Sequence, residues 1–438
     1  MSIETITLIL ILSMLLVLIF GLPIGFALGG VGLVFTYFLW GANGLSMVAA
    51  ATWNLMNTWV LIAAPFFIFT ANVLERTGVA DDLYKMLYVW MGRVKGGLAI
   101  GTVFICCIIA AMVGVVSAGV VSMGLIALPS MLKRGYDKRI AIGCIPAGGA
   151  LGPLIPPSIT MIIYGLYARE SVGRMFAGGV LPGLLLASLF CIYIIVRCII
   201  QPDLCPAIPP EERANWREKF RALKGVFFPM MLIILVLGTV FSGICTPTES
   251  AAMGAVGSLV IGLIQHTLTW KNLREACERT LKLTSMMIWI IIGATCFSTL
   301  YTGMGASVLV QDFVLHLPGG RWAVLIGMQI TFFIMGCFID DIPIIMITCP
   351  IYVPIIKALG FDTLWFAVVF IVNMQMAYLT PPFGVALFYM QSILPKGLTL
   401  TDIYRSIWPF IICQAVGLAL CMIFPEIILW LPRLLLRL

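Results

Sequence analysis

The stretch "PAGGALGPLIPPSITMIIYG" at residues 146–165 contains a double proline, and "MAYLTPPFGVALFYM" at residues 376–390 contains another. The two pairs, Pro156-Pro157 and Pro381-Pro382, lie 225 residues apart. Other residues coincide at the same offset without gaps: Thr77 and Thr302, Gly78 and Gly303, Pro129 and Pro354, Asp137 and Asp362. A duplicated unit in an apolar chain is typical of a secondary transporter, and broken apolar segments at corresponding places indicate its binding site.

The composition predicts an all-α polytopic membrane protein. Hydrophobic residues make up 61% of the 438 residues and charged residues only 10%, whereas a soluble protein is about one quarter charged. A bilayer core needs about 20 apolar residues per helical crossing, and uncharged runs of that length recur along the whole chain. The first run, residues 1–20, lacks a basic segment and an A-x-A site. We therefore interpret it as the first membrane helix and not as a cleaved signal.

Residues 1–200 are predicted to form the first of two repeats. Its 35-residue apolar run at 98–132 is too long for one crossing. A tilted helix is one interpretation, but a re-entrant hairpin that turns at 114–119 fits better, because both basic flanks then lie on one side. Around this hairpin the pattern predicts helices within 5–40 (broken at 21–25) and at 53–74, an amphipathic surface helix within 75–97, a broken helix at 138–168 and a helix at 176–200.

Residues 201–225 are the longest polar stretch and are predicted to form a cytoplasmic linker with a short helix. Residues 226–438 then repeat the order of elements. The pattern predicts helices at 226–245, 250–265 and 284–301, a surface helix at 270–282, a hairpin at 321–357, a broken helix at 363–393 and a last helix at 407–430.

The charge distribution predicts the orientation in the membrane. Each repeat contributes an odd number of crossings plus one hairpin, so the second repeat is inverted relative to the first. If both termini face the periplasm, most of the 26 Lys and Arg residues face the cytoplasm, as the positive-inside rule requires. The basic residues left on the periplasmic side are then Arg169, Arg174, Arg321, Lys357, Arg433 and Arg437.

The candidate site consists of four places where irregular backbone falls inside apolar runs. Two are the hairpin tips, at 114–119 and 339–343, and two are helix breaks, at 147–153 and 373–381. Irregular backbone survives at membrane depth only where it lines a cavity or is buried in protein. Carbonyls freed there suit a cation such as Na⁺, while helix N-termini suit a carboxylate.

Several of these residues also have structural interpretations. Asp340 and Asp341 could form a loop outside the membrane, but apolar runs flank them, and intramembrane carboxylates are functional by default. Ser117 could bond only to its own helix. Asn373 and Gln375 could pair with each other. No Walker loop, GxGxxG or CxxC motif occurs, so ATP-driven pumping and redox chemistry have no support, and an enzyme is disfavoured.

The sequence resembles the large membrane subunit of tripartite ATP-independent periplasmic (TRAP) transporters, the DctM-like permeases. "PAGGALGPLIPPSITMIIYG", "RMFAGGVLPGLLLA" and "LTPPFGVALFYM" carry the resemblance, which extends over essentially the whole chain. It implies an elevator mechanism, Na⁺ coupling, an organic-anion substrate, a small four-helix membrane subunit and a periplasmic substrate-binding protein. No four-helix domain precedes Met1, so the small subunit is expected as a separate chain.

The resemblance also implies site residues. It places one Na⁺ site at Gly114, Ser117, Gly148, Gly149 and Gly152, a second at Asp340, Asp341, Asn373, Met376 and Thr380, and the substrate cavity at Pro156, Pro157, Ser158, Pro381 and Pro382. The first hypothesis is therefore Na⁺-coupled import of a carboxylate, such as a C4-dicarboxylate or a sugar or keto acid, across the bacterial inner membrane, without an organic cofactor. The alternative is a stand-alone dicarboxylate or citrate carrier of a related inverted-repeat fold.

Overall fold

The computed structural model describes residues 2–209, 214–315, 319–382 and 384–436. Arg437 and residues 210–213 of the expected linker lie outside this description. The described residues form helices and turns without a β-strand. Eight of the described helices are long and apolar enough to cross a membrane, or nine if the bent pair Trp59–Glu75 and Val79–Met91 counts as one span. The predicted all-α polytopic class is confirmed.

The first repeat contains the predicted hairpin and broken helix. Gly114 adopts a left-handed conformation (φ 68°) that ends the first hairpin helix, and the second begins two residues later. The broken helix is interrupted at 150–158, where residues 156 and 157 are joined by a cis peptide bond. The elements are α1 (Ile3–Ile19), α2 (Ile24–Met56), η1 (Trp59–Ile62), α3 (Ala63–Glu75), α4 (Val79–Met91), α5 (Gly97–Val113), α6 (Val116–Lys133), α7 (Lys138–Gly149), α8 (Ile159–Ala168) and α9 (Val172–Ile200).

The second repeat follows a short linker. Its elements repeat the order, and α16 begins and ends 225 residues after α6. The elements are η2 (Pro202–Leu204), α10 (Trp216–Ala222), α11 (Lys224–Phe241), α12 (Pro247–Ile264), α13 (Trp270–Gly303), α14 (Ala306–Leu315), α15 (Gly320–Gly336), α16 (Asp341–Ala358), α17 (Thr363–Leu379), α18 (Val385–Ser392), α19 (Leu400–Ile423) and α20 (Glu426–Leu435). The exact division into 1–200 and 226–438 stays a prediction.

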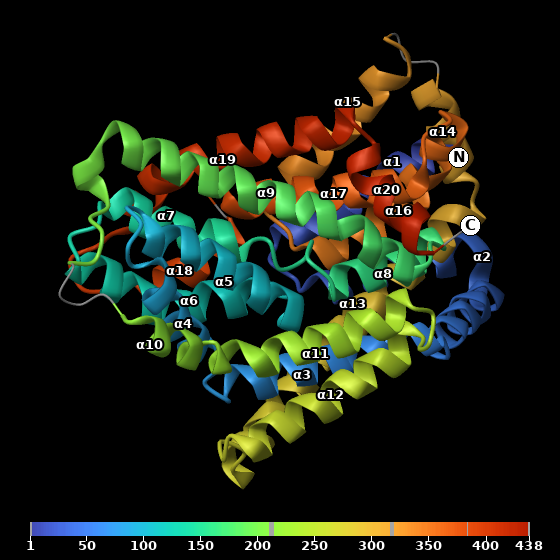
Figure 1. The fold of residues 1–438 in the computed structure, drawn as a ribbon. Helices are drawn as coiled ribbons and strands as arrows, with labels where there is room; N and C mark the ends of the chain where they lie inside the picture. The colour runs from blue at the N-terminus through green and yellow to red at the C-terminus, as the bar shows by residue number, and fades with distance from the viewer. Residues whose placement is uncertain (1, 210–213, 316–318, 383, 437–438) are drawn as a thin grey trace.

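The two hairpins enter the molecule from opposite ends. Helix α9 crosses the structure, and its two ends mark the two sides. Asp137, beside the open end of the α5–α6 hairpin, donates its N–H to Leu204, which follows α9, at 2.7 Å. Thr363, beside the open end of the α15–α16 hairpin, bonds to Glu170, which precedes α9. In Figure 1, α5, α6 and α7 accordingly lie in the left half, and α8 and α16 in the right half.

Three element predictions are wrong. The surface helix at 270–282 and the helix at 284–301 are one helix, α13, because no glycine or proline lies between them. The predicted helix at 53–74 is interrupted at 57–62, since α2 continues past a kink at Gly41 (φ 66°). The last helix is two helices, α19 and α20, separated at Pro425. Helix α14 was not predicted.

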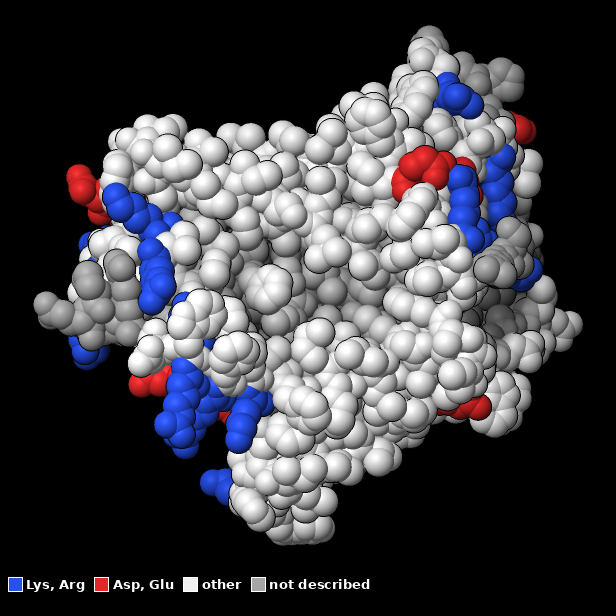
Figure 2. All heavy atoms as spheres, in the orientation of Figure 1, with Lys and Arg blue, Asp and Glu red and all other residues white. Residues whose placement is uncertain are grey.

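The helices form a scaffold and an inner block. In the scaffold, α2 packs against α13, and α3 against α12 and α13. Glu75 at the end of α3 forms an ion pair with Arg279 on α13 at 2.9 Å. The inner block contains both hairpins, both broken helices, α9, α19 and α20, with α7 in contact with α5, α6 and α19. On the face in Figure 2, charged residues gather at the two ends, with a broad uncharged belt between them.

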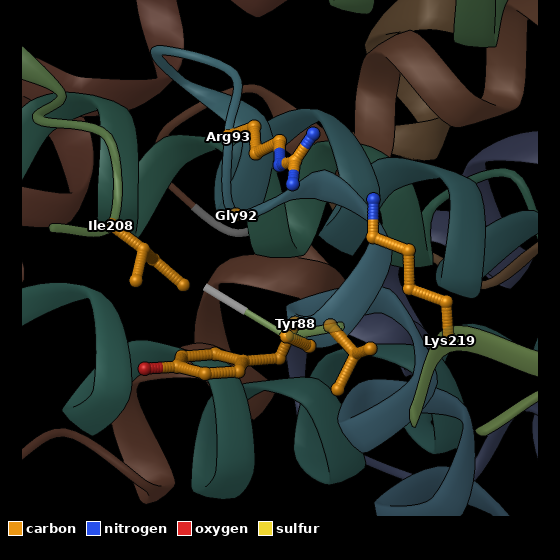
Figure 3. Close-up of a pocket in the computed structure, with 7 residues that line it drawn as sticks. Tyr88, Gly92, Arg93, Ile208 and Lys219 are labelled. Carbon is orange, nitrogen blue, oxygen red and sulfur yellow. The ribbon is translucent and has the colours of Figure 1, made fainter. Parts of the chain in front are cut away.

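The linker is held against the hairpin end of the first repeat. Its Ile208 donates an N–H to Gly92 just after α4 at 2.8 Å, and its Cys205 accepts from Gly96 at 3.2 Å. Tyr88, Gly92, Ile208 and Lys219 surround a small cavity of about 30 Å³ (Figure 3). Lys219 of α10 is buried, with its Nζ 5.0 Å from the ring centre of Trp216. The linker is therefore an ordered connection between the repeats over its described residues.

Candidate functional site

The first hairpin tip packs directly on the first helix break. An ideal Cβ on Gly114 would lie 2.3 Å from the carbonyl oxygen of Pro157, and one on Gly152 would lie 2.9 Å from the carbonyl oxygen of Val115. Such distances are shorter than a side chain tolerates, so only glycine fits at both places. The structure thus brings the tip and the break of the first predicted Na⁺ site together, with two backbone carbonyls at the contact.

The last turn of α7 approaches the same hairpin through its glycines. An ideal Cβ on Gly148 would lie 2.9 Å from the Cβ of Cys106 on α5, and one on Gly149 would lie 2.4 Å from the side chain of Val120 on α6. An ideal Cβ on Gly119 of α6 would lie 3.0 Å from the Cα of Gly149. Ser117 lies half-buried in the first turn of α6. Both hairpin helices therefore hold the break in place.

The residues predicted to line a substrate cavity differ between the repeats. Pro156, Pro157 and Ser158 are buried, whereas Pro381 is half-buried and Pro382 exposed. Ser158 caps α8 by accepting from the N–H of Met161 at 3.3 Å, and its hydroxyl donates to the Pro153 carbonyl at 2.5 Å. The cavity that Pro157 borders, between α3, α5 and α11, has a volume of about 10 Å³. This cavity is too small for an organic anion.

The second hairpin tip carries the two carboxylates. Asp340 caps α16 by accepting the N–H of Asp341 at 3.1 Å, and the Tyr378 hydroxyl donates to the same oxygen at 3.4 Å. Asp341 accepts the N–H of Ile342 at 2.8 Å on one oxygen and the hydroxyl of Thr160 on the other. The Asp341 residue is 5% exposed. Asp341 therefore lies inside the protein, whereas Asp340 is exposed at the hairpin tip. The burial of Asp341 argues against the alternative of an external loop pair.

The amides of the second break pair with other helices and not with each other. Asn373 donates its amide to Gln329 of α15, at 2.6 Å to the backbone carbonyl and 2.8 Å to the side-chain oxygen. Gln375 accepts from Gln414 of α19 at 3.4 Å. The Oδ1 atom of Asn373 is buried and has no hydrogen-bond partner among the described residues. This oxygen is free to bind a cation.

Met376 and Thr380 bring a carbonyl to the same break. The Thr380 hydroxyl donates to the Met376 carbonyl at 2.7 Å. Beyond them the chain folds back toward the end of α17. An ideal Cβ on Gly384 would consequently lie 2.4 Å from the Tyr378 carbonyl oxygen and 3.1 Å from that of Thr380. The second break thus gathers backbone oxygens near the aspartate tip. The assignment of all these residues to Na⁺ or substrate stays a prediction.

Two residues at the site, Thr160 and Gln329, were missed by sequence reasoning, and Tyr378 was placed within the second break but not assigned to a site. Thr160, Tyr378 and Gln329 each bond to a predicted site residue. The offset of 225 residues could not find Thr160, because it aligns positions within the repeats and does not show which residues of one repeat contact the other. Gln329 is a polar residue within an apolar run, and that signal could have found it.

The ligand groups around the aspartate tip fit a small hard cation. They are carboxylate, carbonyl, hydroxyl and amide oxygens, the ligand types that hard cations prefer. Neither Asp340 nor Asp341 forms an ion pair with a Lys or Arg in the described part of the chain. A buried carboxylate such as that of Asp341, next to a second carboxylate and without a positive partner, is unfavourable. A bound cation would remove much of that cost.

Comparison with known proteins gives concordant results. Residues 11–427 match the family described as "Tripartite ATP-independent periplasmic transporter, DctM component". The C4-dicarboxylate TRAP transporter large permease protein DctM of Vibrio cholerae is 30% identical over 450 residues, covering 98% of this chain and 97% of that protein. The sialic acid TRAP transporter large permease protein SiaM of the same species is 28% identical over 417 residues, covering 94% and 95%.

A solved structure supports the fold. The YdaH transporter of Alcanivorax borkumensis matches with a TM-score of 0.62 at 15% sequence identity, covering 89% of this chain and 90% of that chain. At this identity the likeness concerns the arrangement of the helices alone.

Proposed function

This chain belongs to the DctM component family of the tripartite ATP-independent periplasmic transporters, and we propose that it imports a small organic anion coupled to Na⁺. As a transporter permease it is not an enzyme. The substrate class is a carboxylate, such as a C4-dicarboxylate or a sugar acid, in line with the names of the two relatives. The chain acts in the inner membrane, with both termini on the periplasmic side.

One observation carries the Na⁺ proposal. Asp340 and Asp341 lie side by side at a hairpin tip, and their described partners are neutral N–H and O–H donors. An imported cation would balance this charge, and its departure on the other side would restore the repulsion between the carboxylates. The first tip supplies a second candidate position, where the Pro157 and Val115 carbonyls lie close to glycines 114 and 152.

The partners in this proposal are a small membrane subunit and a periplasmic substrate-binding protein. The scaffold offers apolar surface for the subunit, since Trp53 and Trp59 are 71% and 78% exposed and Trp289 is 55% exposed. The binding protein would deliver the substrate at the end where Figure 1 marks both chain termini. An elevator movement of the inner block relative to the scaffold would then carry substrate and Na⁺ across.

Uptake into proteoliposomes tests the proposal. The chain is reconstituted with its small subunit, and radiolabelled carboxylates are supplied with the binding protein under an inward Na⁺ gradient. We expect uptake that requires Na⁺ and the binding protein and needs no ATP. Uptake without the binding protein would favour a stand-alone carrier instead. An uptake rate that is the same with and without the Na⁺ gradient would contradict the proposed Na⁺ coupling.

A further inference from the structure

A contact between the two repeats connects the aspartate tip to the first helix break. Asp341 is the first residue of α16 in the second repeat, and Thr160 lies in the first turn of α8 in the first repeat. The Thr160 hydroxyl donates to Asp341 Oδ2, and the two residues are 4% and 5% exposed. The same tip contacts the second break through Tyr378. The aspartate tip is therefore joined to both broken helices.

The first turn of α8 is also held from its other side. Ser158 caps this turn by accepting from Met161 and donates to Pro153. The preceding carbonyl, that of Pro157, lies so close to Gly114 that a Cβ there would approach it to 2.3 Å. Residues 157–161 thus form a short, hydrogen-bonded segment that touches the first hairpin tip at one end and the second hairpin tip at the other.

From these contacts we propose that Thr160 is a positioning residue that couples the two cation sites. The inference rests on the proposed function, because it takes Na⁺ as the ligand of both tips. A carboxylate oxygen has more than one acceptor position, so Oδ2 of Asp341 can accept from Thr160 while it contacts a cation. A cation that draws Asp341 toward itself shifts the hydroxyl and the α8 turn, and with them the Pro157 carbonyl at the first tip.

Coupling of this kind is reciprocal. If Na⁺ at the aspartate tip raises the affinity of the first tip, Na⁺ at the first tip raises the affinity of the aspartate tip by the same factor. The expected signature is a cooperative dependence on Na⁺ concentration that requires the Thr160 hydroxyl. A residue that only stabilised the fold would not change cooperativity.

The test compares two substitutions at this position with a matched control. Thr160→Val removes the hydroxyl and keeps the shape, whereas Thr160→Ser keeps the hydroxyl. Thr348→Val is the control, since Thr348 is a buried residue of α16 whose hydroxyl, among the described residues, donates to Ile344 of its own helix at 2.6 Å. Two measurements are made on each: the Na⁺ dependence of thermal stability of the purified protein in detergent, and the Na⁺ dependence of uptake.

We expect a Na⁺ Hill coefficient above one for the unsubstituted chain and the Thr160→Ser and Thr348→Val variants. Thr160→Val should reduce it to about one and raise the half-saturating Na⁺ concentration about fivefold or more, in the usual range of coupling between sites. If unsubstituted protein shows no Na⁺ dependence, the proposed function itself fails. If Na⁺ dependence is present but Thr160→Val keeps its cooperativity, or Thr348→Val loses it equally, only the role of Thr160 is overturned.

Discussion

Asp340 has two roles that one substitution can separate. Its side chain caps α16, and its charge adds to that of Asp341. Asparagine caps a helix about as well as aspartate does, so Asp340→Asn removes the charge and keeps the cap. We expect the half-saturating Na⁺ concentration for uptake to rise by up to about fivefold, since Asp340 is exposed and an exposed ionic contact contributes up to about 1 kcal/mol. Asp203→Asn, in the exposed linker, is the control, and an unchanged Na⁺ curve in both Asp340→Asn and Asp341→Asn would place the pair outside the site.

Gly152 tests the close approach between the first tip and the first break. Gly152→Ala would place a methyl group 2.8 Å from the Val115 carbonyl carbon. Because the obstacle is backbone, the tip itself must move, and overpacking of this kind typically costs about 1–3 kcal/mol.

We expect Gly152→Ala to lower the thermal stability of the purified protein and to reduce Na⁺-dependent uptake. Gly327→Ala in α15 is the matched control, because no atom lies within 4 Å of its ideal Cβ and alanine favours a helix over glycine. If Gly152→Ala and Gly327→Ala had equal thermal stability and equal Na⁺-dependent uptake, the first hairpin tip would be loosely packed.

At the scale of elements, the two hairpins were predicted well, because residues with strong backbone preferences lie at their tips. Gly114 and Asp340 mark the hairpin tips, and the predicted hairpins at 98–132 and 321–357 differ from α5–α6 and α15–α16 by one residue at each end. Helix α14 was missed because it lies between Gly305 and Gly319, which have φ angles of 80° and 115°. Its sequence counterpart in the first repeat is α4, and comparing the two would have revealed it.

Contacts between elements could not be predicted in the same way. The pairings of Thr160 with Asp341 and of Gln329 with Asn373 depend on how separate helices are packed, and no periodicity in the chain encodes them. The contact between the first hairpin tip and the first helix break was easier to predict, because such a close approach requires glycine and glycine is visible in the sequence. Sequence reasoning therefore located the breaks and tips but not the side chains that join the two repeats.

The attachment of α10 to α4 can be tested by proteolysis. Trp90 of α4 forms edge-to-face contacts with Trp216 and Phe220, each at 6.5 Å between ring centres, and donates its Nε1–H to the Lys219 carbonyl at 3.0 Å. Such aromatic pairs contribute about 0.5–1.5 kcal/mol each. Loss of both raises the population of the detached linker about tenfold, and cleavage follows that population.

We expect Trp90→Ala to make the linker more sensitive to trypsin at Arg217 and Arg221 in inside-out membrane vesicles. Trp53→Ala, on an α2 residue that is 71% exposed, should leave cleavage unchanged. Cleavage only in right-side-out vesicles would reverse the proposed orientation, and equal cleavage of both variants would show that α10 is not held by Trp90.

At the scale of the whole molecule, three connections join the inner block to the scaffold. Helices α4 and α14 are two of them, and the linker with α10 is the third. The helices of the scaffold are closely packed, since α2 and α13 approach each other so nearly that a Cβ on Gly293 would lie 2.0 Å from the Gly25 carbonyl oxygen. In the elevator proposal the scaffold would therefore behave as one body, and relative motion would occur at its boundary with the block.

A crosslink across that boundary tests the elevator proposal. Ala111 on the first hairpin and Ile233 on α11 border the same small cavity between block and scaffold. After the 13 native cysteines are replaced, Ala111→Cys and Ile233→Cys are joined by a short bifunctional thiol reagent. We expect transport to stop, because the block can no longer move past α11. Na⁺ should still raise the thermal stability of the crosslinked protein, because neither residue bonds to a hairpin tip.

The control crosslink lies within the scaffold. Leu232 on α11 and Gly257 on α12 are in contact, with an ideal Cβ on Gly257 2.6 Å from the Leu232 side chain. Joining cysteines at these two positions should leave transport intact, because both helices belong to the body that stays fixed. If the crosslink between block and scaffold also left transport at its full rate, the inner block would not need to slide. Opening and closing of the hairpin tips alone would then have to move the substrate.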